Sequence, residues 1–494
     1  MKRGRWAGGV LGVLTAVVGL EGVGVAQESR VVLDAVPFLS QPVAPKQRAT
    51  RVAVPIPYAA RVADHKEVGV RPDGAVIWTM RIESPGAVFM SAKFSRFILP
   101  AGVEVTFIAR DGVYQAGPFS TRDMKTTGRF GTPMIPGDEL TIEVVTLPGS
   151  GEPELVLESV SHGFRDALGI GRFFQQADLD RRDGAQRGGP FACQRDIACP
   201  EGAPYFHLKD AAAEGYDGEY VCSGQLVNNA RQDGRYLYIT AAHCEWWRDP
   251  STMAYYWDYA NQTCDGDDYP SFTFSIGSTD LYHSTNPNYD IDLLELDGNL
   301  EGSYDVYFAG WNRGTAAPTR TVAISHPDDK PLQIAIDEDP AKDCAMGGCQ
   351  GGWGAWYWRI DDYEVGVTEG GSSGGGLYDQ NLLLVGVLTG GVGTTCNNFG
   401  WDEFFKLSTE WDALQPFLDP DDTGALSVPG WDGSTAPCAA DLAEPFGQLD
   451  FSDVLAFLSL FATQSPGADL ASPFGVWDFS DVLEFLVQFG GGCE

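Results

Sequence analysis

Short stretches of alternating apolar and polar residues dominate the first third of the chain. The runs AVIWTMRIE (75–83), VEVTFIARD (103–111) and ELTIEVVTL (139–147) are separated by Pro-Gly, Asp-Gly and Pro-Ala pairs. A period of two places successive side chains on opposite faces of a strand, and the intervening pairs are typical of turns. We therefore expect an antiparallel β-sandwich over residues 27–165.

The middle of the chain contains further short strands, among them RYLYITAAHC, DIDLLEL and LLLVGVLTGG. Residues 188–428 hold eight of the ten cysteines, and we expect them to form one mainly β domain. Residues 166–187 end in RRDGAQR and are polar and basic, as an exposed processing segment would be. The stretch PGWDGSTAP predicts a short linker at 429–437.

The last part of the chain, 438–494, is a repeat of a different kind. ADLAEPFGQLDFSDVLAFL recurs as ADLASPFGVWDFSDVLEFL, and apolar residues at helical spacing follow each DFSDV. We expect a small helical pair closed by a disulfide between Cys438 and Cys493, because a core of this size is marginal. Each copy carries three aspartates: Asp441, Asp450, Asp453, and Asp469, Asp478, Asp481.

These repeats resemble dockerin-type or EF-hand-like loops in the spacing DxxxxxGxxDxxD. The resemblance implies calcium, but each copy offers few of the six to eight oxygens that calcium takes. In the alternative interpretation the aspartates cap the helices and no metal is involved. Either way, the pair would serve as an attachment module for a cell-surface or scaffold partner.

The amino terminus is typical of a secretory signal. MKRGR is followed by the apolar run WAGGVLGVLTAVVGL, and GVGVA ends at Ala26 with small residues. We expect cleavage after residue 26, a secreted protein and disulfide-bonded cysteines; an uncleaved anchor is the alternative. No later segment is apolar enough to cross a membrane.

Acidic residues outnumber basic ones in the 494-residue chain, 68 against 33, which gives a formal net charge of −35. Such a balance argues against a nucleic-acid partner, since polyanions need a basic face. It mildly favours basic substrates. We expect a monomer.

The candidate chemistry centres on EGGSSGGGLYD at 369–379. Glycines around a serine leave backbone N–H groups open to an oxyanion, and a serine hydroxyl needs a base to become a nucleophile. His243 in YITAAHC is a candidate base, and Asp290 or Asp292 in NYDIDLLELD would orient it. Spacing alone does not choose between the two aspartates, because both would lie on one side of a strand.

Taken together, these motifs resemble the trypsin-like serine proteases, and within them the bacterial lysyl endopeptidases. The resemblance covers roughly residues 188–428. It rests on the stretches CQRDIACPEG, CSGQLVNN, YYWDYANQTC, DIDLLEL, FAGWNR, ISHPD, GVTEGGSSGGGLY and WDEFFKLSTEW. It implies a chymotrypsin-like double β-barrel, with no cofactor required for catalysis.

The resemblance also assigns roles to individual residues. It implies a triad of His243, Asp290 and Ser373, with the N–H groups of Gly371 and Ser373 as the oxyanion hole. It implies that processing leaves a new amino terminus near Gly188. The disulfides that it implies are Cys193–Cys396, Cys199–Cys264 and Cys222–Cys244, which leaves Cys344 and Cys349 for a local bridge.

Substrate choice is implied in the same way. The position of the trypsin pocket carboxylate is occupied by Val367, whereas the lysyl endopeptidase pocket aspartate matches Asp402. A buried carboxylate favours a cationic P1 side chain; the alternative is that Asp402 is a solvated loop residue. The family's subsite histidine is replaced by Thr389, which leaves arginine open as a second P1 residue.

Activation is expected to differ from that of trypsin. Ser372 stands where trypsin-like zymogens carry the aspartate that binds the freed amino terminus. We therefore expect residues 27–187 to restrain or assist the enzyme instead.

The sequence thus predicts a secreted serine endopeptidase that hydrolyses peptide bonds after lysine. The alternatives are a non-catalytic adhesion or scaffold protein with a protease-like domain, and a serine protease of different P1 specificity.

Overall fold

The computed structural model of the chain describes most of residues 49–433 and part of the carboxyl-terminal repeat. The described residues are 30–34, 49–112, 114–173, 193–244, 249–264, 272–297, 300, 305–347, 349, 352–392, 400–433, 440, 442–443, 449–465, 468, 470–471 and 477–491. The expected signal peptide and the Arg187–Gly188 junction lie outside these residues. So do five site residues named above: Cys396, Cys438, Asp441, Asp469 and Cys493. No helix in the described ranges is long and apolar enough to span a bilayer.

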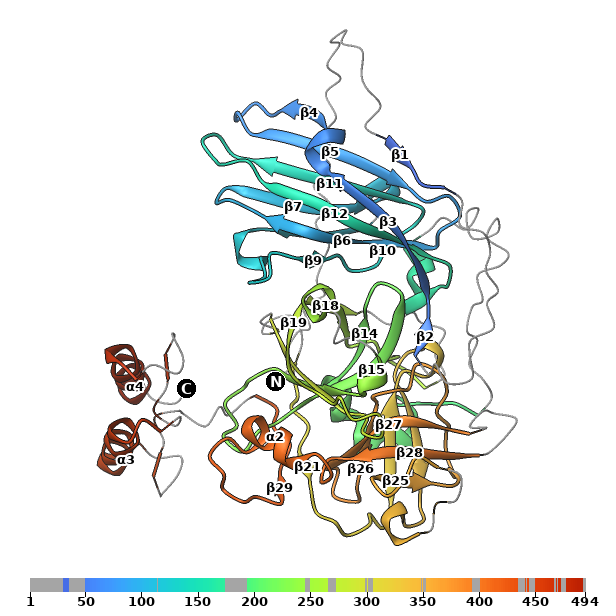
Figure 1. The fold of residues 1–494 in the computed structure, drawn as a ribbon, viewed down its shortest axis with the longest axis vertical. Coiled ribbons are helices and arrows are strands. Elements are labelled where there is room, and N and C mark those ends of the chain that lie inside the picture. Colours follow the sequence, from blue (N-terminus) through green and yellow to red (C-terminus); the bar gives the residue numbers. More distant parts are fainter. Residues whose placement is uncertain are drawn as a thin grey trace, which may run out of the picture.

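The described chain is mainly β, as the sequence predicts, and its strands form four sheets (Figure 1). Two sheets belong to the amino-terminal region. The first has the order β1-β5-β11-β7-β8, with β4 also paired to β5; the second has the order β10-β6-β12-β3, with β9 paired to β6. Their strands are β1 (Arg30–Val32), β3 (Ala53–Arg61), β4 (Glu67–Val70), β5 (Val76–Glu83), β6 (Phe89–Ile98), β7 (Val103–Ala109), β8 (Gln115–Phe119), β9 (Phe130–Gly131), β10 (Ile135–Pro136), β11 (Glu139–Thr146) and β12 (Glu154–Gly163).

The period-two patterns explain how these two sheets meet. In β7 the alternate residues Val103, Val105, Phe107 and Ala109 are buried, while the residues between them are more exposed. They join a hydrophobic cluster that also contains residues of β6 and β12 from the second sheet. One core is therefore shared by both sheets.

The other two sheets lie in the middle of the chain and share a second core. One has the order β18-β17-β14-β15-β16-β20-β19, with β2 added to β15, and the other has the order β13-β23-β22-β26-β27-β28-β25-β24, with β21 and β29. The strands of the former are β2 (Thr50–Arg51), β14 (Ala212–Tyr216), β15 (Tyr220–Val227), β16 (Leu237–Thr240), β17 (Ala254–Trp257), β18 (Thr273–Ile276), β19 (Ser278–His283) and β20 (Asp292–Leu296). The strands of the latter are β13 (Arg195–Asp196), β21 (Trp311–Asn312), β22 (Thr321–Ser325), β23 (Gln333–Asp337), β24 (Lys342–Asp343), β25 (Tyr357–Ile360), β26 (Gly376–Tyr378), β27 (Leu384–Val392), β28 (Trp401–Lys406) and β29 (Ser427–Val428).

Three α-helices lie in the described residues: α2 (Trp411–Leu418), α3 (Phe451–Ala462) and α4 (Phe479–Gly491). Helices α3 and α4 start at the two copies of DFSDV and pack through stacked Phe457 and Phe485 rings, whose centroids are 4.1 Å apart. Both rings belong to a small hydrophobic cluster of their own.

Two expected boundaries differ from the structure. Ala167, Leu168 and Ile170 were placed in an exposed processing segment, yet all three are fully buried. They belong to a hydrophobic cluster with Tyr216 and other residues of the sheet that contains β14, β15 and β17. These three apolar side chains are therefore part of the core, although the rest of the expected segment is polar.

The linker expected at 429–437 also begins later. Trp431 is buried and forms an isolated antiparallel bridge with Phe308, through hydrogen bonds of 2.7 and 2.9 Å. The middle domain therefore extends to at least residue 431, because the aromatic side chain completes its core.

Candidate active site

The candidate base lies on a short turn that a disulfide holds in place. Strand β16 ends at Thr240, and His243 follows in a single helical turn next to Cys244. Cys244 is bonded to Cys222 in the neighbouring strand β15. The histidine backbone is thus fixed relative to β15.

Asp290 contacts this histidine at two points. Its Oδ2 lies 2.7 Å from His243 Nδ1, and its Oδ1 accepts a hydrogen bond of 2.8 Å from His243 N. The Thr389 side chain also helps to lower the pKa of Asp290. Burial tends to raise the pKa of Asp290, but the charge of His243 and these hydrogen bonds outweigh burial and hold the pKa below its ordinary value.

The structure therefore separates the two aspartates that sequence spacing left open. Asp292 opens β20 and its Oδ2 lies 3.6 Å from His283 Nδ1, while Asp290 precedes the strand and contacts His243. The expectation that both side chains share one face of a strand is wrong, because the strand starts only at Asp292. Burial raises the pKa of Asp292 to about 6.

The second nitrogen of the histidine ring has no hydrogen-bond partner among the described residues. His243 Nε2 is buried and unpaired, while Nδ1 faces the carboxylate. A hydrogen bond to Nδ1 fixes the tautomer in which Nε2 carries the lone pair. This nitrogen is therefore suited to accept a proton from a nucleophile.

Ser373 lies on a loop that is anchored to the same strands. Its carbonyl accepts a hydrogen bond of 2.9 Å from Ser223 N, next to Cys222 in β15. A Cβ atom on Gly374 would come within 2.1 Å of Thr240 Oγ1, so the loop passes directly against the end of β16. Ser373 itself is 2% exposed.

The glycines of this loop are required by space and backbone geometry. Gly371 has φ +89°, and a Cβ atom there would lie 2.8 Å from the carbonyl oxygen of His326. Among the described residues, the N–H groups of Gly371 and Ser373 donate no backbone hydrogen bond. They are the two groups that the resemblance assigns to an oxyanion hole.

Ser223 was not identified from the sequence, and it connects three parts of the site. Its hydroxyl accepts a hydrogen bond from His326 N and donates one to Gly371 O, both 2.8 Å long. Its own N–H holds Ser373 O. The motif CSGQ contained the residue, but only the fold brings it to the loop.

Ser372 is fully buried and its hydroxyl has partners other than the candidate triad. Its hydroxyl lies 3.0 Å from Ser325 Oγ and accepts a hydrogen bond of 3.2 Å from Glu369 N. These neutral contacts occupy the position for which trypsin-like zymogens use an aspartate.

Asp402 lies on β28 and is fully buried, so it is not a solvated loop residue. Its Oδ2 accepts hydrogen bonds from the hydroxyls of Tyr363, at 2.9 Å, and Thr368, at 2.5 Å. A Cβ atom on Gly391 in β27 would come within 2.1 Å of Asp402 Oδ1. The carboxylate therefore lies between β27 and the start of the loop that carries Ser373.

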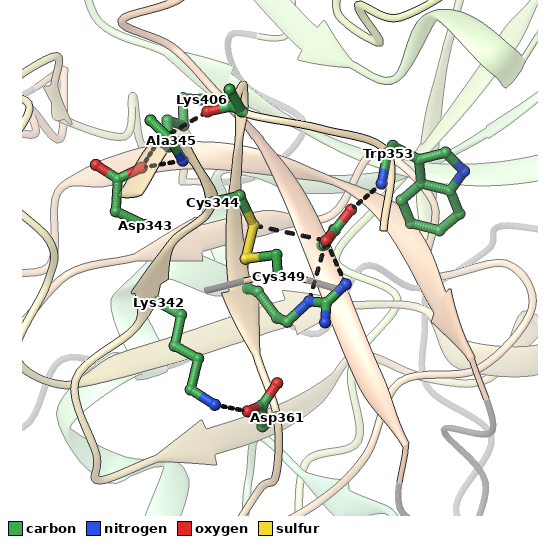
Figure 2. The surroundings of a disulfide bond; sticks show 11 residues. Lys342, Asp343, Cys344, Ala345, Cys349, Trp353, Asp361 and Lys406 are labelled. Atoms are coloured by element: carbon green, nitrogen blue, oxygen red, sulfur yellow. Dashed lines mark hydrogen bonds and ion pairs between the residues drawn. A yellow bond between two sulfur atoms is a disulfide. The ribbon is translucent and has the colours of Figure 1, made fainter. Parts of the chain in front are cut away.

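A second buried carboxylate follows on the same strand and has its own cation. Glu403 pairs with Arg359 at 2.7 Å and accepts a hydrogen bond of 2.8 Å from Trp353 N. The local disulfide Cys344–Cys349 lies against this pair (Figure 2). Glu403 and Asp402 are successive residues of β28 and so point to opposite faces of the sheet. The contacts of Glu403 therefore hold the strand on one face, and Tyr363 contacts Asp402 on the other.

The structure contains three of the expected disulfides, Cys199–Cys264, Cys222–Cys244 and Cys344–Cys349. Cys193 is also disulfide-bonded, and its expected partner Cys396 lies outside the described residues.

In the carboxyl-terminal repeat the described aspartates act as helix caps. Asp453 Oδ1 accepts from the N–H groups of Leu442 and Ala443, and its Oδ2 accepts from Asp450 N. Asp481 makes the matching contacts in the second copy, with Asp478 as the residue before the helix. N–H donors aimed at a carboxylate occupy the lone pairs that a cation would need. Calcium binding stays a prediction.

Comparison with known proteins places these residues in a family context. Residues 188–405 match the family described as lysyl endopeptidase, C-terminal domain. Over 294 residues the chain is 30% identical to the lysyl endopeptidase of Pseudomonas aeruginosa, covering 55% of this chain and 59% of that protein. The chain thus spans less than two thirds of that relative's length.

Solved structures also match part of the chain, at low similarity. Human heparin binding protein is 18% identical with a TM-score of 0.33, over 46% of this chain and 96% of that chain. Kallikrein-related peptidase 10 is 14% identical with a TM-score of 0.30, over 43% and 98%. The HtrA-type protease AlgW with tripeptide is 12% identical with a TM-score of 0.31, over 44% and 62%.

Proposed function

We propose that this protein is a secreted serine endopeptidase that cleaves peptide bonds after lysine, with arginine open as a second P1 residue. The observation that carries the proposal is the contact between His243 and Asp290, which leaves Nε2 without a hydrogen-bond partner among the described residues, Ser373 Oγ included. The Ser373 loop itself lies against Thr240, at the end of the strand that leads to His243. The similarity of residues 188–405 to lysyl endopeptidase supports it.

In the proposed mechanism, Ser373 Oγ attacks the carbonyl carbon of the scissile bond and its proton passes to His243 Nε2. The N–H groups of Gly371 and Ser373 stabilise the oxyanion. The imidazolium, held by Asp290, then gives the proton to the leaving amine. Water hydrolyses the acyl-enzyme with His243 again acting as base.

Lysine preference follows from the charge of Asp402. Its hydroxyl partners, Tyr363 and Thr368, orient the carboxylate but carry no positive charge. A buried carboxylate is unfavourable until a cation pairs with it, so a P1 ammonium group would be preferred over a neutral side chain.

The carboxyl-terminal helix pair is proposed as an attachment module. The two copies expose apolar side chains at matching positions: Phe451 and Phe479, Leu455 and Leu483, and Leu458 and Leu486. An exposed apolar surface of this kind is typical of a binding face.

The decisive experiment is labelling by a phosphonate with a lysine-like P1 group. We expect labelling of the wild-type protein and of S372A, and none of S373A, because only Ser373 lies at the site of attack. Hydrolysis of peptides with Lys, Arg, Glu or Leu at P1 then measures specificity. Failure to label the wild type would favour a non-catalytic adhesion protein, and equal cleavage after Leu would favour another specificity.

A further inference from the structure

The N–H group of Gly371, one of the two candidate oxyanion donors, belongs to a tight turn formed by residues 369–372. Ser372 N donates a hydrogen bond of 3.1 Å to Glu369 O, and Glu369 N donates one of 3.2 Å to Ser372 Oγ. Gly371 has φ +89°, a value typical of the third residue of a type II turn. The direction of its N–H group therefore depends on what holds this turn in place.

Two contacts hold the peptide groups on either side of Gly371. Asp328 N donates to Gly370 O, and Ser223 Oγ donates to Gly371 O at 2.8 Å. Because a trans peptide bond is planar, its N–H group points in the direction opposite to its carbonyl oxygen. The Gly371 N–H group is therefore directed away from Asp328 N, and it donates no backbone hydrogen bond among the described residues.

The side chain of Glu369 is anchored to a buried lysine through an amide. Glu369 Oε2 accepts a hydrogen bond of 3.1 Å from Gln194 Nε2, and Gln194 Oε1 accepts one of 2.8 Å from Lys330 Nζ. Gln194 is 6% exposed and Lys330 is 5% exposed. The amide presents its oxygen to the cation and its N–H group to the carboxylate, so it connects the two charges in the favourable orientation.

Lys330 and Asp328 belong to one short segment, 326–330, which contacts the turn. His326 Nδ1 lies 2.9 Å from Lys330 O and closes this segment. Burial lowers the pKa of Lys330, and the negative charges of Asp328 and Glu369 oppose this shift. Burial raises the pKa of Glu369, and the charge of Lys330 opposes that shift in turn. The cation and the carboxylate thus stabilise each other's charged forms.

Resting on the proposed function, we propose that Lys330, acting through Gln194, is a positioning residue for the oxyanion hole. It holds the Glu369 side chain and so keeps the 369–372 turn in the form that leaves the Gly371 N–H group open. Trypsin-like zymogens use a cation on the residue just before the nucleophile, which is the neutral Ser372 here. In this chain the cation acts instead on Glu369, at the start of the turn, and a freed amino terminus is not needed.

The proposal predicts which part of catalysis depends on Lys330. Negative charge develops on the substrate oxygen only as the tetrahedral intermediate forms, so a misplaced Gly371 N–H group raises the barrier to acylation. The P1 side chain would bind through Asp402, which lies on β28 and not in the turn. Loss of Lys330 should therefore lower kcat and leave binding in the P1 pocket unchanged.

The test uses the full chain and compares the wild type with K330M and Q194M. Two reversible inhibitors separate the two kinds of binding. Butylamine occupies only the P1 pocket, whereas a peptide aldehyde ending in lysinal also adds to Ser373 and places an oxygen in the oxyanion hole.

In both variants we expect kcat for a lysine anilide to fall roughly 10- to 100-fold, less than the loss of an entire oxyanion donor causes. The inhibition constant of the aldehyde should rise by a similar factor, and that of butylamine should not change. The K330M/Q194M double variant should be no less active than the weaker single variant, because the two residues act in one chain of contacts.

K125M is the matched control. Lys125 is also a buried lysine whose pKa burial lowers, but its partners are Ile276 O and Asp297. We expect K125M to keep the wild-type kcat and both inhibition constants, even if its melting temperature falls as much as that of K330M.

Several results would overturn the inference. They are an unchanged kcat in K330M and Q194M, an equal loss of affinity for both inhibitors, additive losses in the double variant, and the same split in K125M. If K330M does not fold, Q194M decides by the same criteria. A wild-type protein that labels with phosphonate while these variants keep its kcat would remove this inference and leave the proposed function standing. A wild type that does not label would remove the proposed function itself.

Discussion

Replacement of Asp402 by asparagine isolates the charge of the candidate specificity pocket. The side chain keeps its shape, and its carbonyl oxygen can still accept hydrogen bonds from Tyr363 and Thr368. The fully buried site loses only its negative charge. Any change in substrate choice can therefore be attributed to the missing ion pair with the substrate.

The size of the effect follows from burial. Loss of one partner from a buried ion pair costs about 3–5 kcal/mol. Since a factor of ten corresponds to about 1.4 kcal/mol, kcat/KM for a lysine substrate should fall roughly 10²- to 4 × 10³-fold. Leucine substrates should change little, because they gain nothing from the carboxylate.

The assay compares kcat/KM for matched peptides that differ only in P1, Lys against Leu, in wild type and D402N. D379N is the control, since Asp379 is also a buried carboxylate but caps the turn between β26 and β27. We expect it to keep the lysine preference. A D402N protein that folds and still prefers lysine by the wild-type ratio would refute the reasoning.

Three further outcomes are expected. T389V removes the hydroxyl that helps to lower the pKa of Asp290, so kcat should fall roughly 10- to 100-fold and T389S should restore it; unchanged kcat would exclude a role in the site. R359M leaves Glu403 buried without its cation and should lower the free energy of unfolding by about 3–5 kcal/mol in urea titrations, whereas a small loss would indicate that the site rearranges. Burial raises the pKa of Asp329 from 3.8 to about 7, so its stabilising protonated form is lost as pH rises through about 7. Thermal unfolding of D329N should therefore depend less on pH between about 4 and 7 than that of wild type, and parallel curves would contradict this.

Much of the fold was predictable because local patterns and burial agree. The alternation in 103–109 became β7 with its apolar face buried, and DFSDV began both helices of the repeat. The boundaries were less predictable. Trp431 lies in a stretch with linker composition, and its place in the core depends on Phe308, far away in the sequence.

The candidate site shows the same division. His243 and Ser373 stand in motifs that suggest a base and a nucleophile, so the sequence was enough to propose them for these roles. The choice of Asp290 depended on where β20 begins, which period-two spacing does not fix. The roles of Ser223 and Thr389 were not predictable, since each acts on a residue that is distant in the sequence.

The sequence by itself determined the β-rich character, the residue types for acyl transfer and the helix starts of the repeat, because these depend on neighbours along the chain. Only the tertiary structure decided which carboxylate meets His243, that Asp402 is buried, and that β2 lies beside Gly371. Those facts depend on strand register and on contacts between segments that are distant in the sequence, and neither can be read from local composition.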